Sequence, residues 1–213
     1  MMTYRLIIFD FDGTLADSFT WAASVVNQFA DQYGFRRIDP SEHETLRVLD
    51  AKTLMQQLGV PMWKVPIMAA HVHRLMGQQI DHITLFDGIE RQLQCLDASG
   101  AVLAVVSSNA EQNIRRVLGP ANSALIDYFE CGAAVFGKSS KLKTVLRHSR
   151  IAPDQSILIG DEIRDADAAR QVHMAFGAVA WGYTNYDALL AQSPNVSFGR
   201  VDELSEKLVG GCS

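Results

Sequence analysis

Short apolar segments that lead directly into acidic, hydroxyl or lysine residues are the feature of this sequence that most constrains its fold. The clearest are Leu6–Phe9 before Asp10-Phe-Asp12-Gly-Thr14, Val102–Val106 before Ser107-Ser108-Asn109, Ala133–Phe136 before Gly137-Lys138, and Ser156–Ile159 before Gly160-Asp161. Helical patterns separate the later segments, and this alternation is typical of a parallel sheet covered by helices. Ligands bind beyond the carboxyl ends of the strands in such sheets, so we expect the polar residues to meet in one crevice.

A long helical stretch separates the first predicted strand from the second. The pattern predicts a helix over Phe19–Tyr33, and a capping-box pattern at Ser41-Glu-His-Glu44 opens another helix. Pro61 and Pro66 then mark a break before a last helical run to about His82.

These elements predict an α/β fold in two parts. Residues 1–16 and 86–213 form the sheet domain, and residues 17–85 form a helical insert that stands on it. A further strand is expected at Ala178–Trp181, and glycines at 100 and 119 mark the expected ends of two core helices.

Composition and charge exclude several classes of protein. The 213 residues carry a net charge of −5, which argues against a general nucleic-acid or anionic-membrane partner. The sequence has no apolar run long enough to span a membrane and no signal-peptide layout at its start. Its three cysteines are far apart and form no Cys-x-x-Cys pair, so we expect unpaired thiols and a cytoplasmic protein.

The residues that follow the strands suggest metal-assisted phosphoryl chemistry. Asp10 and Asp12 are two positions apart, so on an extended backbone their carboxylates point to the same side and repel unless a cation lies between them. Asp161 and Asp165 add hard oxygen ligands of the kind that Mg²⁺ prefers. A lysine and the hydroxyl and backbone N–H groups after the second strand would then bind the phosphoryl oxygens.

Together these segments resemble the four motifs of the haloacid dehalogenase superfamily, in the same order and over nearly the whole chain. They are Asp10-Phe-Asp-Gly-Thr-Leu-Ala-Asp17, the strand that ends in Ser107, Lys138, and Gly160-Asp-Glu-Ile-Arg-Asp165. The resemblance implies a Rossmann-like core with a small helical cap, as in phosphoglycolate-phosphatase-like members.

The resemblance also implies a role for each motif residue. Asp10 would be the nucleophile and Asp12 the general acid and base, and the backbone carbonyl of Asp12 would join Asp10 and Asp161 in binding Mg²⁺. Asp165 would support the metal directly or through water and Lys138. Ser107 would bind the phosphate, with the backbone at Ser108 beside it, and Lys138 would steady both nucleophile and phosphate.

Several alternatives remain open at these positions. Lys141 lies three residues after Lys138, and the residue after Lys138 is Ser139 where the family usually has proline. Ser108 and Asn109 also suit the start of a helix. The stretch from Gly132 to Ser139 matches a phosphate-loop pattern, which would indicate a nucleotide-binding protein, although its apolar middle is better explained as a strand.

Within the superfamily, the sequence favours a phosphatase. Dehalogenases lack the second aspartate of the first motif, and phosphomutases of the β-phosphoglucomutase kind typically have a histidine where this chain has Ala22. A non-catalytic binding protein is the remaining alternative. We expect a small phosphorylated metabolite as substrate and the insert as a mobile lid; the sequence does not indicate an oligomeric state.

Overall fold

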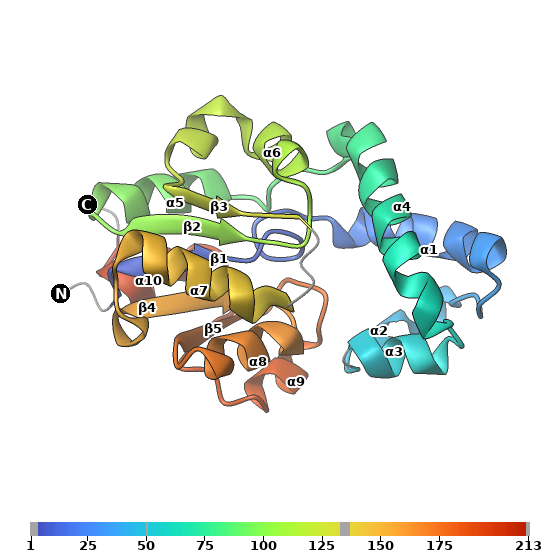
Figure 1. The fold of residues 1–213 in the computed structure, drawn as a ribbon. Helices are drawn as coiled ribbons and strands as arrows, with labels where there is room; N and C mark the ends of the chain where they lie inside the picture. The colour runs from blue at the N-terminus through green and yellow to red at the C-terminus, as the bar shows by residue number, and fades with distance from the viewer. Residues whose placement is uncertain (1–3, 50, 133–136, 212–213) are drawn as a thin grey trace.

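The computed structural model describes residues 4–49, 51–132 and 137–211, and six parallel strands form its central sheet (Figure 1). The strands are β1 (Leu6–Phe9), β2 (Val102–Val106), β3 (Tyr128–Glu130), β4 (Ser156–Gly160), β5 (Ala175–Val179) and β6 (Val196–Phe198). Their order in the sheet is β3-β2-β1-β4-β5-β6. The expected α/β fold with a parallel sheet is therefore confirmed.

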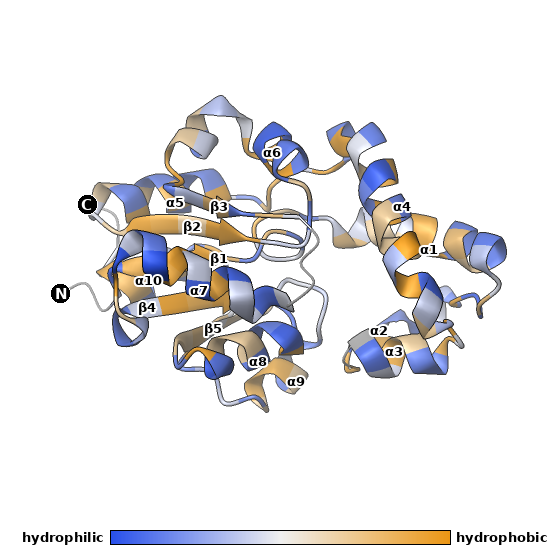
Figure 2. Cartoon of the chain, viewed as in Figure 1, coloured by the Kyte–Doolittle hydropathy of each residue, from blue (hydrophilic) through white to orange (hydrophobic). Residues whose placement is uncertain are grey.

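Helices cover both faces of the sheet. On one face lie α5 (Ile89–Ala98), α6 (Glu111–Ala124) and α10 (Glu203–Val209), and on the other lie α7 (Gly137–Ser149), α8 (Ile163–Gln171) and α9 (Tyr186–Leu190). Because side chains of a strand alternate between faces, Ile7 and Phe9 pack in the first core and Leu6 and Ile8 in the second. The central strands β1 and β2 are apolar throughout, as expected for strands covered on both faces (Figure 2).

The helices between β1 and α5 form a separate lobe at the carboxyl ends of the strands (Figure 1). They are α1 (Phe19–Tyr33), α2 (His43–Leu46), α3 (Ala51–Gln57) and α4 (Val65–Gln78). Short 3-10 turns precede α2 at Pro40–Glu42 and α4 at Met62–Lys64, and a third follows α4 at Ile80–His82. A small core of its own includes Ile38, Leu46, Leu58 and Val60. We call this lobe the cap; its division from the core at residues 17–85 stays a prediction.

The third strand differs from the expectation. The predicted strand at 133–136 lies outside the described residues, and the strand beside β2 is Tyr128–Glu130. This edge strand has three half-buried residues, so it lacks the continuous apolar pattern of its neighbours. Lys138 lies in the first turn of α7.

Three smaller predictions were also wrong in detail. The fifth strand lies at Ala175–Val179, earlier in the chain than expected. The capping box is formed by Asp39 and Glu42, because the Asp39 side chain accepts a hydrogen bond from Ser41 N at 2.9 Å and so opens the turn before the predicted residues. Cys95 takes part in a disulfide, contrary to the expectation of unpaired thiols.

Glycines end one core helix and interrupt another at the predicted places. Gly100 follows α5 with φ 83°, a left-handed conformation that glycine adopts readily. Gly119 interrupts α6 with φ 72° and ψ 169°, and the chain then continues as helix to Ala124. In the described part of the chain, no helix has the length and apolar character needed to cross a membrane.

The core packing predicts that replacing two leucines will have very different effects on stability. Leu158 is fully buried in β4, whereas Leu190 is 39% exposed. We expect Leu158→Ala to lower the free energy of unfolding in urea by about 2–5 kcal/mol, because a cavity remains where the side chain was. Leu190→Ala is the control and should lower it by less than about 1 kcal/mol. Equal losses of unfolding free energy in the two variants would contradict the core packing described here.

Candidate active site

Asp10 lies at the carboxyl end of β1, where one of its carboxylate oxygens accepts a backbone hydrogen bond and the other faces the ammonium of Lys138. Its Oδ1 accepts a hydrogen bond from Phe11 N at 2.8 Å. Its Oδ2 lies 2.8 Å from Lys138 Nζ, and apart from this ion pair it has no hydrogen-bond partner among the described residues. Since Asp10 is 2% exposed, Oδ2 is a buried, under-satisfied oxygen of the kind that functional sites contain.

Three buried aspartates meet at this point. Oxygens of Asp10, Asp161 and Asp165 all lie within 4.8 Å of one another. Asp10 and Asp161 come together because β1 and β4 are neighbours, with Phe9 opposite Ile159. Asp165 reaches back from the first turn of α8. Oxygen atoms alone in a buried cluster fit a hard divalent cation.

Neighbouring groups fix the orientation of Asp161. Its Oδ1 accepts a hydrogen bond from Thr14 Oγ1 at 2.7 Å, and its Oδ2 accepts one from Tyr183 N at 2.7 Å. Gly13 and Gly182 pack against it closely: an added Cβ would lie 2.3 Å from Asp161 Oδ2 in the first case and 2.1 Å from Asp161 Cβ in the second. The carboxylate is therefore enclosed by backbone that only glycine allows.

The charges in the cluster perturb one another. Burial, then the charges of Glu162, Asp10 and Asp165, raise the pKa of Asp161 well above its ordinary value. Burial opposes the charge on Lys138, but Asp10 and Asp165 outweigh it and raise the pKa of the ammonium. Lys138 Nζ donates to Asp165 Oδ1 at 2.5 Å as well as facing Asp10. One ammonium thus offsets part of the charge of three carboxylates, and a cation would offset the rest.

Asp12 lies beside this cluster and is not part of it. The residue is half-buried, and Asn109 Nδ2 donates to its Oδ2 at 3.1 Å. Burial, then the charge of Asp10, raise the pKa of Asp12 to about 6, whereas hydrogen bonds from Ser18 and Asn109 lower it. Its carboxylate is therefore set apart from the three that converge, and near neutral pH it is within reach of both protonation states.

The two lysines of the third motif take different directions. Lys138 reaches Asp10 and Asp165, as described above. Lys141 donates to the backbone carbonyls of Ser107 and Gly132, and so binds the loop that follows β2. Burial lowers the pKa of Lys141. The geometry thus favours Lys138 over Lys141 as the lysine of the site. The ion pairs of Lys138 with two aspartates do not support the alternative that this segment is a nucleotide-binding phosphate loop.

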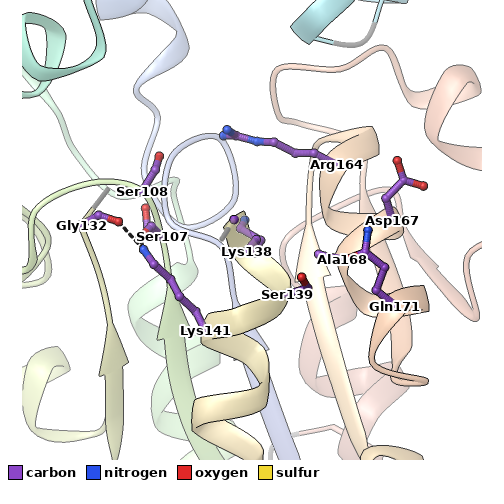
Figure 3. A pocket seen from close by; sticks show the side chains of 11 residues that line it. Ser107, Ser108, Gly132, Lys138, Ser139, Lys141, Arg164, Asp167, Ala168 and Gln171 are labelled. Carbon is purple, nitrogen blue, oxygen red and sulfur yellow. Dashed lines mark hydrogen bonds between the residues drawn. The ribbon is translucent and has the colours of Figure 1, made fainter. Parts of the chain in front are cut away.

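A cavity of about 470 Å³ opens beside these lysines (Figure 3). Its lining includes Ser107, Ser108, Lys138 and Arg164. Figure 3 shows the Arg164 side chain extending across the top of the pocket toward the side where Ser108 lies. Arg164 donates to Glu162 Oε1 at 2.5 Å. Sequence reasoning missed Arg164, although its place between two motif aspartates was a signal.

The cap contacts the core through the loop that follows β5. Arg47 donates to the backbone carbonyls of Tyr183 at 2.9 Å and Gly182 at 2.6 Å. The Phe19 ring stands edge-on to that of Tyr183, with centroids 5.3 Å apart. An apolar cavity of about 210 Å³ lies beside these contacts and is lined partly by Leu46. The backbone N–H of Tyr183 donates to Asp161, so the residue that accepts from Arg47 also contacts the carboxylate cluster.

The chain is similar to known proteins over most of its length. The family model described as haloacid dehalogenase-like hydrolase matches residues 7–179. The phosphoglycolate phosphatase of Synechococcus elongatus is 31% identical over 192 residues, which cover 90% of this chain and 91% of that protein. The tyrosine-protein kinase PtkA of Mycobacterium tuberculosis is 29% identical, over 96% of this chain and 72% of that protein. A predicted phosphatase from Clostridium acetobutylicum shares the fold, with a TM-score of 0.80 at 21% identity over 97% of this chain and 98% of that one.

The close packing around Asp161 predicts an unequal effect of two glycine substitutions. Gly182→Ala should lower the free energy of unfolding by roughly 1–3 kcal/mol, because Asp161 or the loop must shift to admit the methyl group. Gly199→Ala is the control, since its nearest neighbour to an added Cβ is 3.6 Å away. Urea unfolding of both variants measures the difference. If Gly182→Ala is no less stable than Gly199→Ala, the packing described here is wrong.

Proposed function

We propose that this chain, which belongs to the haloacid dehalogenase-like hydrolases and is a phosphatase of that family, hydrolyses small phosphomonoesters through a phosphoaspartyl intermediate on Asp10. The observation that carries the proposal is the state of Asp10 Oδ2. It is buried, faces Lys138 at 2.8 Å, and is otherwise without a hydrogen-bond partner among the described residues. An oxygen so placed is free to attack a phosphorus atom that Lys138 helps to bind.

Mg²⁺ is the proposed cofactor. Asp10, Asp161 and Asp165 would hold it together with the backbone carbonyl of Asp12, and the donor set of carboxylate and carbonyl oxygens fits this ion. When bound, the metal would neutralise the carboxylates and polarise the phosphoryl group. The convergence of the three buried carboxylates within 4.8 Å of one another and the raised pKa of Asp161, which burial causes first, both support a cation at this place.

The first chemical step transfers the phosphoryl group to the protein. Asp10 Oδ2 forms a bond to phosphorus while the bond from phosphorus to the ester oxygen breaks. Protonated Asp12 gives its proton to that leaving oxygen, so the product departs as a neutral alcohol. Lys138 and the backbone N–H groups after Ser107 hold the phosphoryl oxygens during transfer.

The second step restores the enzyme. Asp12, now a carboxylate, accepts a proton from water as the water oxygen attacks phosphorus. The bond between phosphorus and Asp10 Oδ2 breaks, inorganic phosphate leaves, and Asp12 is again protonated. One residue therefore acts as acid and then as base, which suits a pKa of about 6.

The cap is the proposed determinant of substrate size. It stands at the carboxyl ends of the strands and contacts the loop that holds Asp161 (Figure 1). A closed cap leaves room for a small phosphorylated metabolite but not for a folded phosphoprotein or nucleic acid. Closure would also exclude bulk water during phosphoryl transfer.

A phosphate-release screen tests the function as a whole. We expect turnover of an aryl phosphate and of at least one small metabolite from a panel that includes phosphoglycolate, the substrate named for the Synechococcus relative. Absence of phosphate release from every compound, with Mg²⁺ present, would favour a non-catalytic binding protein. Transfer of the phosphoryl group to a second hydroxyl of the same sugar would indicate a phosphomutase.

The nucleophile assignment predicts that Asp10→Asn lowers kcat by a factor of roughly 10⁴ or more, because an amide cannot attack phosphorus. The variant should still unfold cooperatively. Asp97→Asn is the control, since Asp97 is exposed on α5 and remote from the site. Substantial residual turnover in a preparation free of wild-type enzyme would refute the assignment.

The acid assignment predicts that Asp12→Ala reduces kcat/KM far more for alkyl phosphates than for aryl phosphates. A poor leaving group needs a proton, whereas a phenolate does not. kcat/KM is the relevant constant because it reports the steps up to formation of the phosphoenzyme. Equal losses on both substrates would mean that Asp12 only shapes its loop.

The cofactor assignment predicts that EDTA abolishes turnover and that Mg²⁺ restores it. Mg²⁺ should also raise the unfolding temperature of the metal-free protein, because it binds only the folded cluster. Asp161→Asn should lose both responses, and Asp154→Asn, at an exposed site, should keep both. Full activity in verified metal-free protein would exclude the assigned cofactor.

A further inference from the structure

Asn109 lies where the loop after β2, the Asp12 loop and the cap meet. Its side chain is fully buried, and every polar atom of its amide has partners. Nδ2 donates to Asp12 Oδ2 at 3.1 Å and to Met76 Sδ at 2.8 Å. Oδ1 accepts from Ala110 N at 2.8 Å and from Asn113 Nδ2 at 3.1 Å. Two donors and two acceptor sites are therefore all used.

This network allows only one orientation of the amide. If the group were turned over, Oδ1 would face the carboxylate of Asp12 and Nδ2 would face the N–H of Ala110. Both contacts would then join like with like, so the hydrogen-bond pattern fixes the donor toward Asp12. A buried group with all of its partners satisfied is also rigid.

A role at the start of α6 accounts for only half of these contacts. The bond from Ala110 N to Oδ1 is a local one of the kind that serine or aspartate also makes near a helix start. The Nδ2 half of the amide contributes nothing to that role. It is directed at Asp12, and aspartate at position 109 would keep the acceptor but lose this donor.

We infer that Asn109 is a positioning residue that holds Asp12 for proton transfer to the leaving group. The inference rests on the proposed function in that Asp12 is the general acid. Ser18 supports Asp12 as well, and its Oγ lies 3.0 Å from the hydroxyl of Tyr183. A carboxylate fixed in this way loses fewer orientations on reaching the transition state than a freely rotating one.

The cap takes part in the same network through α4. Met76 is 4% exposed and accepts from Asn109, and the carbonyl of His73 accepts from Asn113 Nδ2 at 3.4 Å. At Gly77 an added Cβ would lie 3.0 Å from Asn113 Oδ1, so the helix backbone approaches α6 closely (Figure 1). Asn109 therefore contacts Asp12 with one hydrogen and the cap with the other, so the cap is linked to Asp12 through it.

The experiment compares kcat/KM on an alkyl and an aryl phosphate for wild type, Asn109→Asp, Asn109→Ala, Asp12→Ala and the double variant Asp12→Ala/Asn109→Ala. We expect each Asn109 variant to lose roughly 10–100-fold on the alkyl phosphate and less than about 5-fold on the aryl phosphate. In the Asp12→Ala background, loss of Asn109 should cost less than about 3-fold on either substrate, because the group it positions is gone.

Asn122→Ala is the matched control, since Asn122 is a buried asparagine on α6 that bonds Leu118 O and Glu90. It should leave the alkyl-to-aryl ratio at the wild-type value. Asn113→Ala, which removes one bond to Asn109 Oδ1, should shift the ratio in the same direction as Asn109→Asp but less, and it serves if the Asn109 variants do not fold.

The outcomes distinguish the positioning role of Asn109 from the proposed acid role of Asp12. If Asp12→Ala alters the ratio and Asn109→Asp does not, or if the losses multiply in the double variant, the positioning role is wrong and the acid assignment stands. If Asp12→Ala itself costs the same on both substrates, the acid assignment fails first. A wild-type ratio for Asn113→Ala, where the Asn109 variants are unfolded, also overturns the inference.

Discussion

The ion pairs of Lys138 with Asp10 and Asp165 are the interaction on which the site depends. All three side chains are nearly or fully buried, and isolated charges in such a place are strongly disfavoured. Without the ammonium of Lys138, the three buried carboxylates of the cluster would repel one another. The second requirement of the cluster is hydrogen bonding to Asp161, which Thr14 and the backbone of Tyr183 supply. Charge balance and close packing thus act on the same few atoms.

The sheet and the helices packed on it set the positions from which these side chains begin. β1 and β4 lie side by side at its centre, and Asp10 N donates to Ile159 O at 2.9 Å. The two carboxylates that follow these strands therefore begin at the same level of the sheet. α7 and α8 pack against each other on one face, so Lys138 and Asp165 in their first turns come together. Regular structure, which is rigid, carries the most demanding part of the geometry.

The cap is joined to the core at contacts that involve the same chemical groups. On one side Arg47 binds carbonyls of the loop whose N–H holds Asp161. On the other side α4 contacts Asn109, which donates to Asp12. The cap is therefore linked through hydrogen bonds to the residues that contact Asp161 and Asp12. Such contacts join segments far apart in the sequence, and no local pattern marks them.

The sequence by itself determined the sheet and the set of chemical groups. Apolar segments that end in aspartate or serine predicted β1, β2 and β4 and the crevice at their ends, because burial and strand periodicity are local properties. Lys138 was expected directly after a strand; it lies in the first turn of α7, and the segment expected to be that strand lies outside the described residues. The place of β3 and the contacts that Asn109 and Arg47 make were not predicted and were decided only by the tertiary structure. A short edge strand has no strong pattern of its own, and an asparagine or arginine acquires its partner only when distant segments pack together.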